Sequence, residues 1–184
     1  MSAQRPAWVA ELLRFWFEET PPSRWFAKDD DFDRAVRARF LAAHEAAAAL
    51  DLAACLADAD TALAAAIALD QLPRNMFRDT PRAFATDARA RAVAEGAIAA
   101  GFDAQLPAER RQFLYLPLEH AEDAGAQARS VALFAALGPE YVRWAEAHKA
   151  IIDRFGRFPH RNAILGRPST PEELAFLEEP GSSF

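Results

Sequence analysis

The sequence contains one cysteine, Cys55, so it has neither a disulfide framework nor the cysteine pairs that hold a structural zinc ion. It also lacks long apolar stretches. No run approaches the roughly 18 uninterrupted apolar residues that span a membrane, and Arg5, Pro6 and Glu11 break up the N-terminal one. We therefore expect no signal peptide, no membrane partner and a soluble cytoplasmic protein with Cys55 in its core.

The common catalytic signatures are missing as well. The sequence has no Walker loop, no Rossmann glycine fingerprint, no Gly-x-Ser-x-Gly elbow, no His-Glu-x-x-His and no Glu-x-x-His. His120 and Glu122 are metal-ligand types, but two residues at this spacing do not make a site, because a metal needs three or more placed ligands. We expect no metal and no cofactor.

The net charge is −6, from 21 basic and 27 acidic residues, which argues against nucleic acid as a partner. The basic residues are concentrated in two islands, Pro73–Arg91 and Arg143–Arg167. Such islands favour binding of an anion. The alternative is that their arginines form structural ion pairs with carboxylates elsewhere in the fold.

The hydrophobic pattern predicts helices throughout the 184 residues, arranged as antiparallel pairs in a single domain, 1–184. No alternating β-branched run is long enough to predict a strand. Aspartate, threonine, proline and glycine mark the ends of the predicted helices: from Pro6 to Thr20, from Asp29 past Phe40, around Leu52–Leu56, from Asp58 or Asp60 to Pro73, from Thr86 or Asp87 to Gly101, from Pro107 to a break at Pro117, then to Leu137, from Pro139 to Gly156, and from Thr170 to Pro180.

Hydrogen-bonding side chains interrupt the apolar face of several predicted helices. His148 shares a face with Trp144 and Ile151 or Ile152, and Asp70 follows Ile67 by three residues. In the helix expected after Pro117, His120, Ala124, Gln127, Val131 and Phe134 form a similar stripe. Each inward polar group needs a partner, because a buried unpaired polar atom costs roughly 1–3 kcal/mol. These groups either satisfy one another or line a shared cleft.

The connection from Arg154 to Thr170 is the richest in polar chemistry, with four arginines, His160 and Asn162 among aromatic residues and prolines. Gly156 predicts the end of one helix, and Thr170 with Glu173 predicts a capping box at the start of the next. The segment is therefore expected to form one wall of a site or a fastening of the last helix.

Several motifs resemble the bacterial DUF924 family of uncharacterised proteins. They are Trp25-Phe26 with Phe32-Asp33, L-D-Q-L-P-R-N from Leu69 to Asn75, F-A-T-D from Phe84 to Asp87, F-L-Y-L-P-L-E-H-A-E-D from Phe113 to Asp123, R-F-G-R-F-P-H-R-N from Arg154 to Asn162, S-T-P-E-E from Ser169 to Glu173, and P-G-S-S-F at the end. The resemblance implies a tetratricopeptide-like helical-repeat fold, whose concave surface often receives extended peptides. Ala121 departs from it, because serine commonly follows the histidine in that family.

Three hypotheses about function follow. The first is a binding module for a small anionic ligand or an acidic peptide, the second is a hydrolytic enzyme in which a histidine and Asp70 or Glu122 activate water, with or without a metal, and the third is a purely structural cluster. The candidate ligand-binding residues are Asp70, Arg74, Asn75, His120, Gln127, His148, Arg157, His160, Arg161 and Asn162. No catalytic nucleophile is identifiable.

Overall fold

The computed structural model describes residues 5–183, and within this range the chain is helical with no β-strand, which confirms the all-α prediction. None of these helices is both long enough and apolar enough to cross a membrane. The helices group into two compact units. The N-terminal unit consists of Met1–Arg78 and Arg82–Pro117, and the C-terminal unit of Asp79–Pro81 and Leu118–Phe184. That the two form a single domain stays a prediction.

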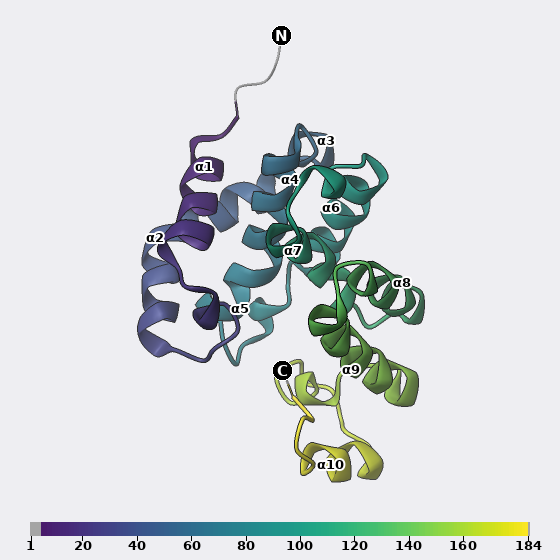
Figure 1. Ribbon diagram of the computed structural model, residues 1–184. Helices are drawn as coiled ribbons and strands as arrows, with labels where there is room; N and C mark the ends of the chain where they lie inside the picture. Colours follow the sequence, from purple (N-terminus) through teal and green to yellow (C-terminus); the bar gives the residue numbers. More distant parts are fainter. Residues whose placement is uncertain (1–4, 184) are drawn as a thin grey trace. The chain divides into compact units, whose positions relative to one another are not determined.

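Helices of very different length, two of them π-helical, follow one another through the described part of the N-terminal unit (Figure 1). They are α1 (Ala7–Arg14), the π-helix η1 (Phe15–Glu19), η2 (Pro22–Arg24), α2 (Asp30–Ala49), α3 (Leu52–Cys55), α4 (Ala59–Ala66), the π-helix η3 (Ile67–Gln71), α5 (Leu72–Met76), α6 (Asp87–Ala99) and η5 (Asp103–Gln105). The unit boundary crosses η4 (Pro81–Ala83) and α7 (Ala108–Glu119), where it falls directly after Pro117.

The core of the N-terminal unit is built around α4, whose residues from Ala62 to Ala66 are completely buried. Alanine suits this place because it favours a helix and its small side chain lets neighbouring helices approach closely, and α1 and α6 both pack on α4. Trp16 and Phe113 supply bulk, with their rings edge to face at 5.8 Å between centroids. Cys55 is buried, as predicted.

Pro73 does not end its helix, contrary to the sequence prediction. The π-helix η3 leads into α5, and Pro73 lies in the first turn of α5. Because proline has no N–H, it cannot bond the carbonyl of Leu69, four residues earlier. The hydroxyl of Thr86 donates to that carbonyl instead, at 2.5 Å. Thr86 precedes α6 but makes no side-chain cap bond, so the helix cap predicted there does not form through Thr86, whose hydroxyl bonds η3 instead.

Most of the predicted helix ends are confirmed. The side chain of Asp29 accepts the N–H groups of Asp31 and Phe32 at the start of α2, and that of Asp58 accepts the N–H of Thr61 at the start of α4. These bonds satisfy donors that the first turn of a helix leaves without partners.

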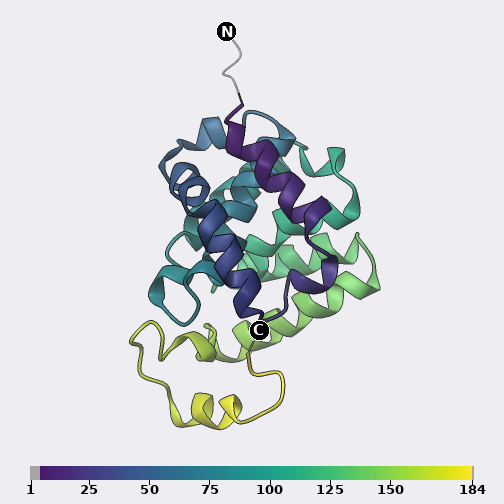
Figure 2. The ribbon, with the colours of Figure 1, turned by 90° about the vertical axis from the view of Figure 1, so that its left-hand side faces the viewer.

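The C-terminal unit contains the last residues of α7, then α8 (Ala124–Ala135), α9 (Pro139–Phe155), η6 (Pro159–Arg161) and α10 (Pro171–Leu177). Helices α8 and α9 pack side by side, and α10 packs near η6 (Figures 1 and 2). Gly156 ends α9 with φ +70°, a left-handed conformation that suits glycine. Ile151, Ile152 and Phe158 form one hydrophobic core cluster of this unit.

Two sequence predictions in this unit are wrong. The helix expected to carry both His120 and Gln127 is broken, because α7 ends at Glu119 and α8 begins at Ala124, with Asp123 as its cap. His120 therefore lies in the break between two helices. On α9, His148 and Ile151 are buried as expected, but Trp144 is 52% exposed.

Candidate functional site

The candidate residues of the N-terminal unit, Asp70, Arg74 and Asn75, lie on η3 and α5 and contact carboxylates of neighbouring helices. Arg74 donates to both carboxylate oxygens of Asp87 at 3.0 Å and to the backbone oxygen of Asp70 at 2.6 Å. Asn75 donates to Asp33 at 2.7 Å. These bonds join α5 to α2 and α6, as the structural interpretation of the basic island Pro73–Arg91 predicts.

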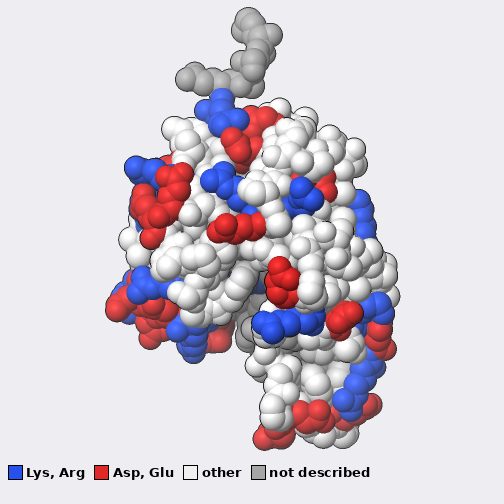
Figure 3. Space-filling model, viewed as in Figure 1, with Lys and Arg blue, Asp and Glu red and all other residues white. Residues whose placement is uncertain are grey.

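The arginines that flank α10 likewise form ion pairs. Arg157 makes two bonds to Glu173, at 2.7 and 2.8 Å, and Arg167 makes two bonds to Glu122, at 2.6 and 2.8 Å. The hydrogen bonds from Arg157, with further bonds from Thr170 and Asn162, hold the pKa of Glu173 down at about 2. On the face drawn in Figure 3, basic side chains lie beside acidic ones, consistent with such pairing.

Asn162 is completely buried in the connection between α9 and α10 and stabilises it through hydrogen bonds. Its amide donates to Ser169 at 3.0 Å and to Glu173 at 3.3 Å, and its side-chain oxygen accepts from Arg167 at 3.0 Å. Asn162 and Arg157 thus belong to a network that fastens α10 to the end of α9, with the predicted capping box of Thr170 and Glu173 as part of it.

The histidines form a different arrangement, in which α9 faces the end of α7. Nδ1 of His148 lies 2.8 Å from the backbone oxygen of Trp144 and 3.3 Å from Oε1 of Glu119. The ring centroids of His120 and His148 are 5.9 Å apart. Glu119 and His148 are only 3% and 5% exposed. A buried carboxylate and two imidazoles are therefore adjacent in this unit.

Gln127 stabilises the turn between α7 and α8 in which His120 lies. Its amide donates to the backbone oxygens of Glu119, at 2.6 Å, and of Ala121, at 2.8 Å. Carbonyls at the end of a helix have no partner within the helix, so a buried side chain from α8 satisfies them here. Ala121, where the family resemblance implied serine, contributes to this turn through its backbone.

Phe158 brings the connection after α9 next to the histidines. Its buried ring contacts the rings of His148 and His160, each at 5.7 Å between centroids, and the guanidinium of Arg161 lies over it at 4.5 Å. The N–H of Phe158 donates to Glu122 at 2.8 Å, which fixes the backbone at this point. We call His120, His148, His160 and Arg161 the basic cluster.

Burial, followed by the neighbouring His120, lowers the pKa of His148 to about 3, with smaller effects in the same direction from Arg161 and His160. The imidazole is therefore neutral near pH 7. Its Nδ1 has an oxygen as hydrogen-bond partner, so the proton belongs on Nδ1 and the lone pair on Nε2. A neutral imidazole of this kind is suited to accept a hydrogen bond or to bind a metal.

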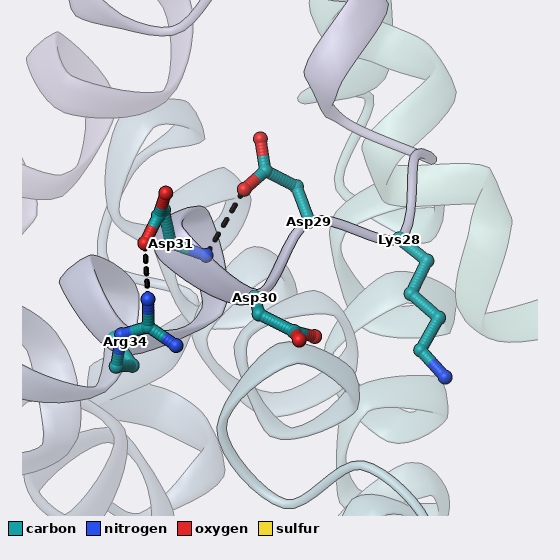
Figure 4. A pocket seen from close by; sticks show the side chains of 5 residues that line it. All are labelled: Lys28, Asp29, Asp30, Asp31 and Arg34. Atoms are coloured by element: carbon teal, nitrogen blue, oxygen red, sulfur yellow. Dashed lines mark hydrogen bonds and ion pairs between the residues drawn. The ribbon is translucent and has the colours of Figure 1, made fainter.

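A hollow at the start of α2 is lined by Lys28, Asp29, Asp30, Asp31 and Arg34 (Figure 4). Two of its acidic residues have structural roles in α2, since Asp29 caps the helix and Asp31 forms an ion pair with Arg34 one turn later. The cap at Asp29 agrees with the helix start that the sequence predicts there. The hollow therefore supplies no additional chemistry.

The structure thus brings part of the candidate set together. His120, Gln127, His148, His160 and Arg161 gather in the C-terminal unit, whereas Asp70, Arg74 and Asn75 belong to the other unit and have carboxylate or amide partners there. That Asp70 meets the histidines stays a prediction. The sequence did not single out Glu119 or Phe158. A glutamate directly before a histidine at the end of a helix is the sequence signal for Glu119. The sequence does not predict that α7 ends there, so this signal is not visible in it.

Comparison with known proteins agrees with the family resemblance of the sequence motifs. The model of the family described as "Bacterial protein of unknown function (DUF924)" matches residues 12–181. A solved structure of a protein of unknown function from Agrobacterium tumefaciens is similar to this chain with 46% identity and a TM-score of 0.89, covering 94% of this chain and 97% of that one. No curated protein matches.

Proposed function

The chain belongs to the DUF924 family, whose description assigns no activity, and we propose from the site itself that it is a helical binding protein for a small anionic molecule. The proposed ligand carries a carboxylate or phosphate group, and the C-terminal carboxylate of an acidic peptide is included. Arg161 of the basic cluster holds that group. The tetratricopeptide-like fold that the family resemblance implies, which stays a prediction, favours the peptide form of the ligand, because such folds often receive extended peptides.

The observation that carries this proposal is the position of Arg161, whose guanidinium lies over the ring of Phe158, the ring that also contacts His148 and His160. Its permanent positive charge attracts an anion by the Coulomb interaction. The same charge is one of the causes that lower the pKa of His148, after burial and His120. The buried carboxylate of Glu119 reduces this attraction, which favours an anion placed nearer to Arg161 than to Glu119.

Arg161 supplies the geometry. Its guanidinium lies over the ring of Phe158, and the residue as a whole is only 6% exposed. The side chain is therefore held in one orientation. Stacking uses the flat face of a guanidinium, and its N–H groups lie in the plane, where they form paired hydrogen bonds with carboxylate or phosphate oxygens. Arg157 and Arg167 are assigned to the network of α10, because each already forms two bonds with a glutamate.

Thermal unfolding in the presence of anions tests the proposal. Inorganic phosphate, succinate and a short acidic peptide with a free C-terminus are the probes, each raised until the melting temperature stops changing. Ligand at 100 times its Kd stabilises by about 2.7 kcal/mol, which corresponds to an increase of about 5–10 °C for a chain of this size. We expect one probe class to raise the melting temperature of the wild type, and Arg161→Gln to lose that increase.

Arg157→Gln is the matched control. It removes an arginine of the same connection that is paired with Glu173, so we expect a lower melting temperature without ligand but the same increase on adding it. If no probe raises the melting temperature, or if Arg161→Gln responds as the wild type does, the proposal is wrong.

A hydrolytic function is a second candidate, favoured by the contact of 3.3 Å between Glu119 and His148. A carboxylate beside an imidazole is a common arrangement for activating water. Because the pKa of His148 is about 3, its imidazole is a weak base near neutral pH, so Glu119 would be the base. Hydrolysis of phosphate and carboxylic ester substrates by the wild type, lost in Glu119→Gln, is the expected result, and equal rates for both proteins would contradict it.

A further inference from the structure

We propose that Glu119, His120 and His148 form a binding site for a divalent transition-metal ion of the Zn²⁺ class. Each of the three side chains offers a ligand atom, and these atoms lie within 4.8 Å of one another. No other group of three such residues lies this close together in the part of the chain that the structure describes. The sequence did not lead us to expect a metal, because it did not reveal Glu119 as the third ligand.

The ligand types select the metal. Two imidazoles and one carboxylate are ligands of zinc and its neighbours in the first transition row, whereas Mg²⁺ and Ca²⁺ prefer oxygen ligands alone. Ligand atoms bound to zinc at about 2.0–2.1 Å in a tetrahedron are about 3.4 Å apart. The atoms here therefore need to approach one another by about 1.4 Å or less.

The orientation of His148 fits this role. Histidine ligands of metals usually donate their other ring N–H to a carbonyl or carboxylate, which fixes the tautomer and aims the remaining nitrogen at the ion. Nδ1 of His148 has this partner in the Trp144 backbone oxygen, and the ring packs nearly edge-on against Phe158, at 81° between the ring planes. Nε2 is then the nitrogen left to bind the ion, whereas the contact of 3.3 Å to Oε1 of Glu119 is made by Nδ1, so the carboxylate has to turn toward Nε2 for both groups to bind one ion.

The other two ligands are held by the break after α7. Glu119 is the last residue of that helix and His120 directly follows it. Gln127 bonds the backbone oxygens on either side of His120, those of Glu119 and Ala121. One buried amide from α8 thus fixes the backbone that carries two consecutive ligands.

The charges around the site indicate how the coordination is completed. Glu119 offsets one positive charge of the ion, while Arg161 and His160, which act electrostatically on His148, disfavour a bare cation. They favour an anion or hydroxide as the fourth ligand. Three protein ligands with one open position are the pattern of catalytic rather than structural zinc sites. The inference does not rest on the proposed function, since the metal ligands are Glu119, His120 and His148 whether or not Arg161 binds an anion.

Metal titration of the full chain tests the site. The protein is stripped with a chelator, moved to a buffer without phosphate or carboxylate, and titrated with Zn²⁺ by calorimetry, with metal content measured after gel filtration. We expect about one Zn²⁺ per chain and weaker binding of Mg²⁺. Glu119→Gln and His148→Gln should each lower the affinity for Zn²⁺ by about 100-fold or more, because each removes a direct ligand.

His44→Gln is the matched control. His44 is a buried histidine of the N-terminal unit with the same kind of contact, Nδ1 to the backbone oxygen of Ala68 at 2.9 Å, and it belongs to no metal-capable group in the described range. Its variant should bind Zn²⁺ as the wild type does. Arg161→Gln removes a positive charge beside the site and keeps all three ligands, so it should bind Zn²⁺ at least as tightly as the wild type, which separates this test from that of anion binding.

Co²⁺ provides a readout that does not depend on variants. Bound tetrahedrally by nitrogen and oxygen ligands, it should give an intense visible absorption band in the wild type, which added Zn²⁺ abolishes. Circular dichroism of each variant checks that it is folded. Absence of stoichiometric Zn²⁺ binding and of the Co²⁺ band, or undiminished Zn²⁺ binding in folded Glu119→Gln and His148→Gln, would overturn the proposal.

Discussion

Arg157 and Glu173 form a doubly hydrogen-bonded ion pair that joins the end of α9 to the first turn of α10, with contacts of 2.7 and 2.8 Å. Glu173 also accepts the N–H of Thr170 and the amide of Asn162, and its side chain is 3% exposed. The glutamate is thus the centre of the network, since each of these three donors contacts its carboxylate. Changes at this position are expected to loosen the C-terminal unit.

Glu173→Gln should lower the free energy of unfolding by about 2–3 kcal/mol, because it removes a buried charge while its partner Arg157 remains. Urea denaturation measures the change. Arg154→Gln is the control, because the pair of Arg154 with Glu172 is exposed on both sides and is worth about 0.5 kcal/mol or less. Equal losses in the two variants would contradict a special role for Glu173.

The low pKa of His148 predicts a dependence of stability on pH. The unfolded chain takes up a proton on this histidine below about pH 6.5, whereas the folded chain does so only near pH 3. Between these values the unfolded state binds more protons, so the free energy of unfolding falls as the pH falls, by about 1.4 kcal/mol per pH unit at most.

Urea denaturation of the wild type and of His148→Gln at pH 7, 6, 5 and 4 measures this contribution. The curve of His148→Gln should be flatter than that of the wild type over this window, since a glutamine does not titrate. Parallel curves would show that His148 does not stay neutral in the folded protein.

The hydroxyl of Thr86 replaces the hydrogen bond that Pro73 cannot make to the Leu69 carbonyl. Thr86→Val keeps the shape of the side chain but leaves this buried oxygen without a donor, at a cost of about 1–3 kcal/mol. The measurement is again the free energy of unfolding in urea.

Pro73→Ala supplies the matching second change, because alanine restores an N–H four residues after Leu69. The double variant Thr86→Val with Pro73→Ala should be less destabilised than the sum of the two single variants. Simple additivity would mean that the two groups do not compete for the same carbonyl.

Gln127→Met tests the break between α7 and α8. The substitution conserves the approximate volume of a completely buried side chain but removes both bonds to the carbonyls beside His120. We expect a loss of about 1–3 kcal/mol in stability. If the proposed metal site exists, Zn²⁺ affinity should also fall by about 10–100-fold, because the ligands lose their support. Calorimetry separates the two effects, and unchanged stability would contradict the structural role.

Local features of the sequence were sufficient for most helix ends. The caps at Asp29, Asp58 and Thr170 and the stop at Gly156 were predicted correctly, because capping involves residues within one turn of each other. Pro73 was assigned wrongly, since its cost in a helix is offset by η3 and by Thr86, which is distant in the sequence. A rule for an isolated helix does not include such a partner.

The candidate site was predicted in composition but not in arrangement. His148 and Gln127 were correctly expected to be buried, because the helical period places them with apolar neighbours. Arg157 was included among the ligand-binding candidates, but its bonds to Glu173 were not foreseen, because an irregular connection without a period separates Arg157 from the helix that carries Glu173. Burial of polar groups follows from periodicity, whereas their pairing depends on which helices become neighbours.

The sequence by itself determined the helical class and most helix boundaries, because propensity, capping and apolar periodicity act over a few residues. Only the tertiary structure decided that Glu119 and His120 meet His148, and that Phe158 carries His160 and Arg161 to the same place. These contacts join residues far apart in the chain, and the packing of α9 and η6 fixes their positions. The charge and chemistry of the site therefore arise from packing that no single segment encodes.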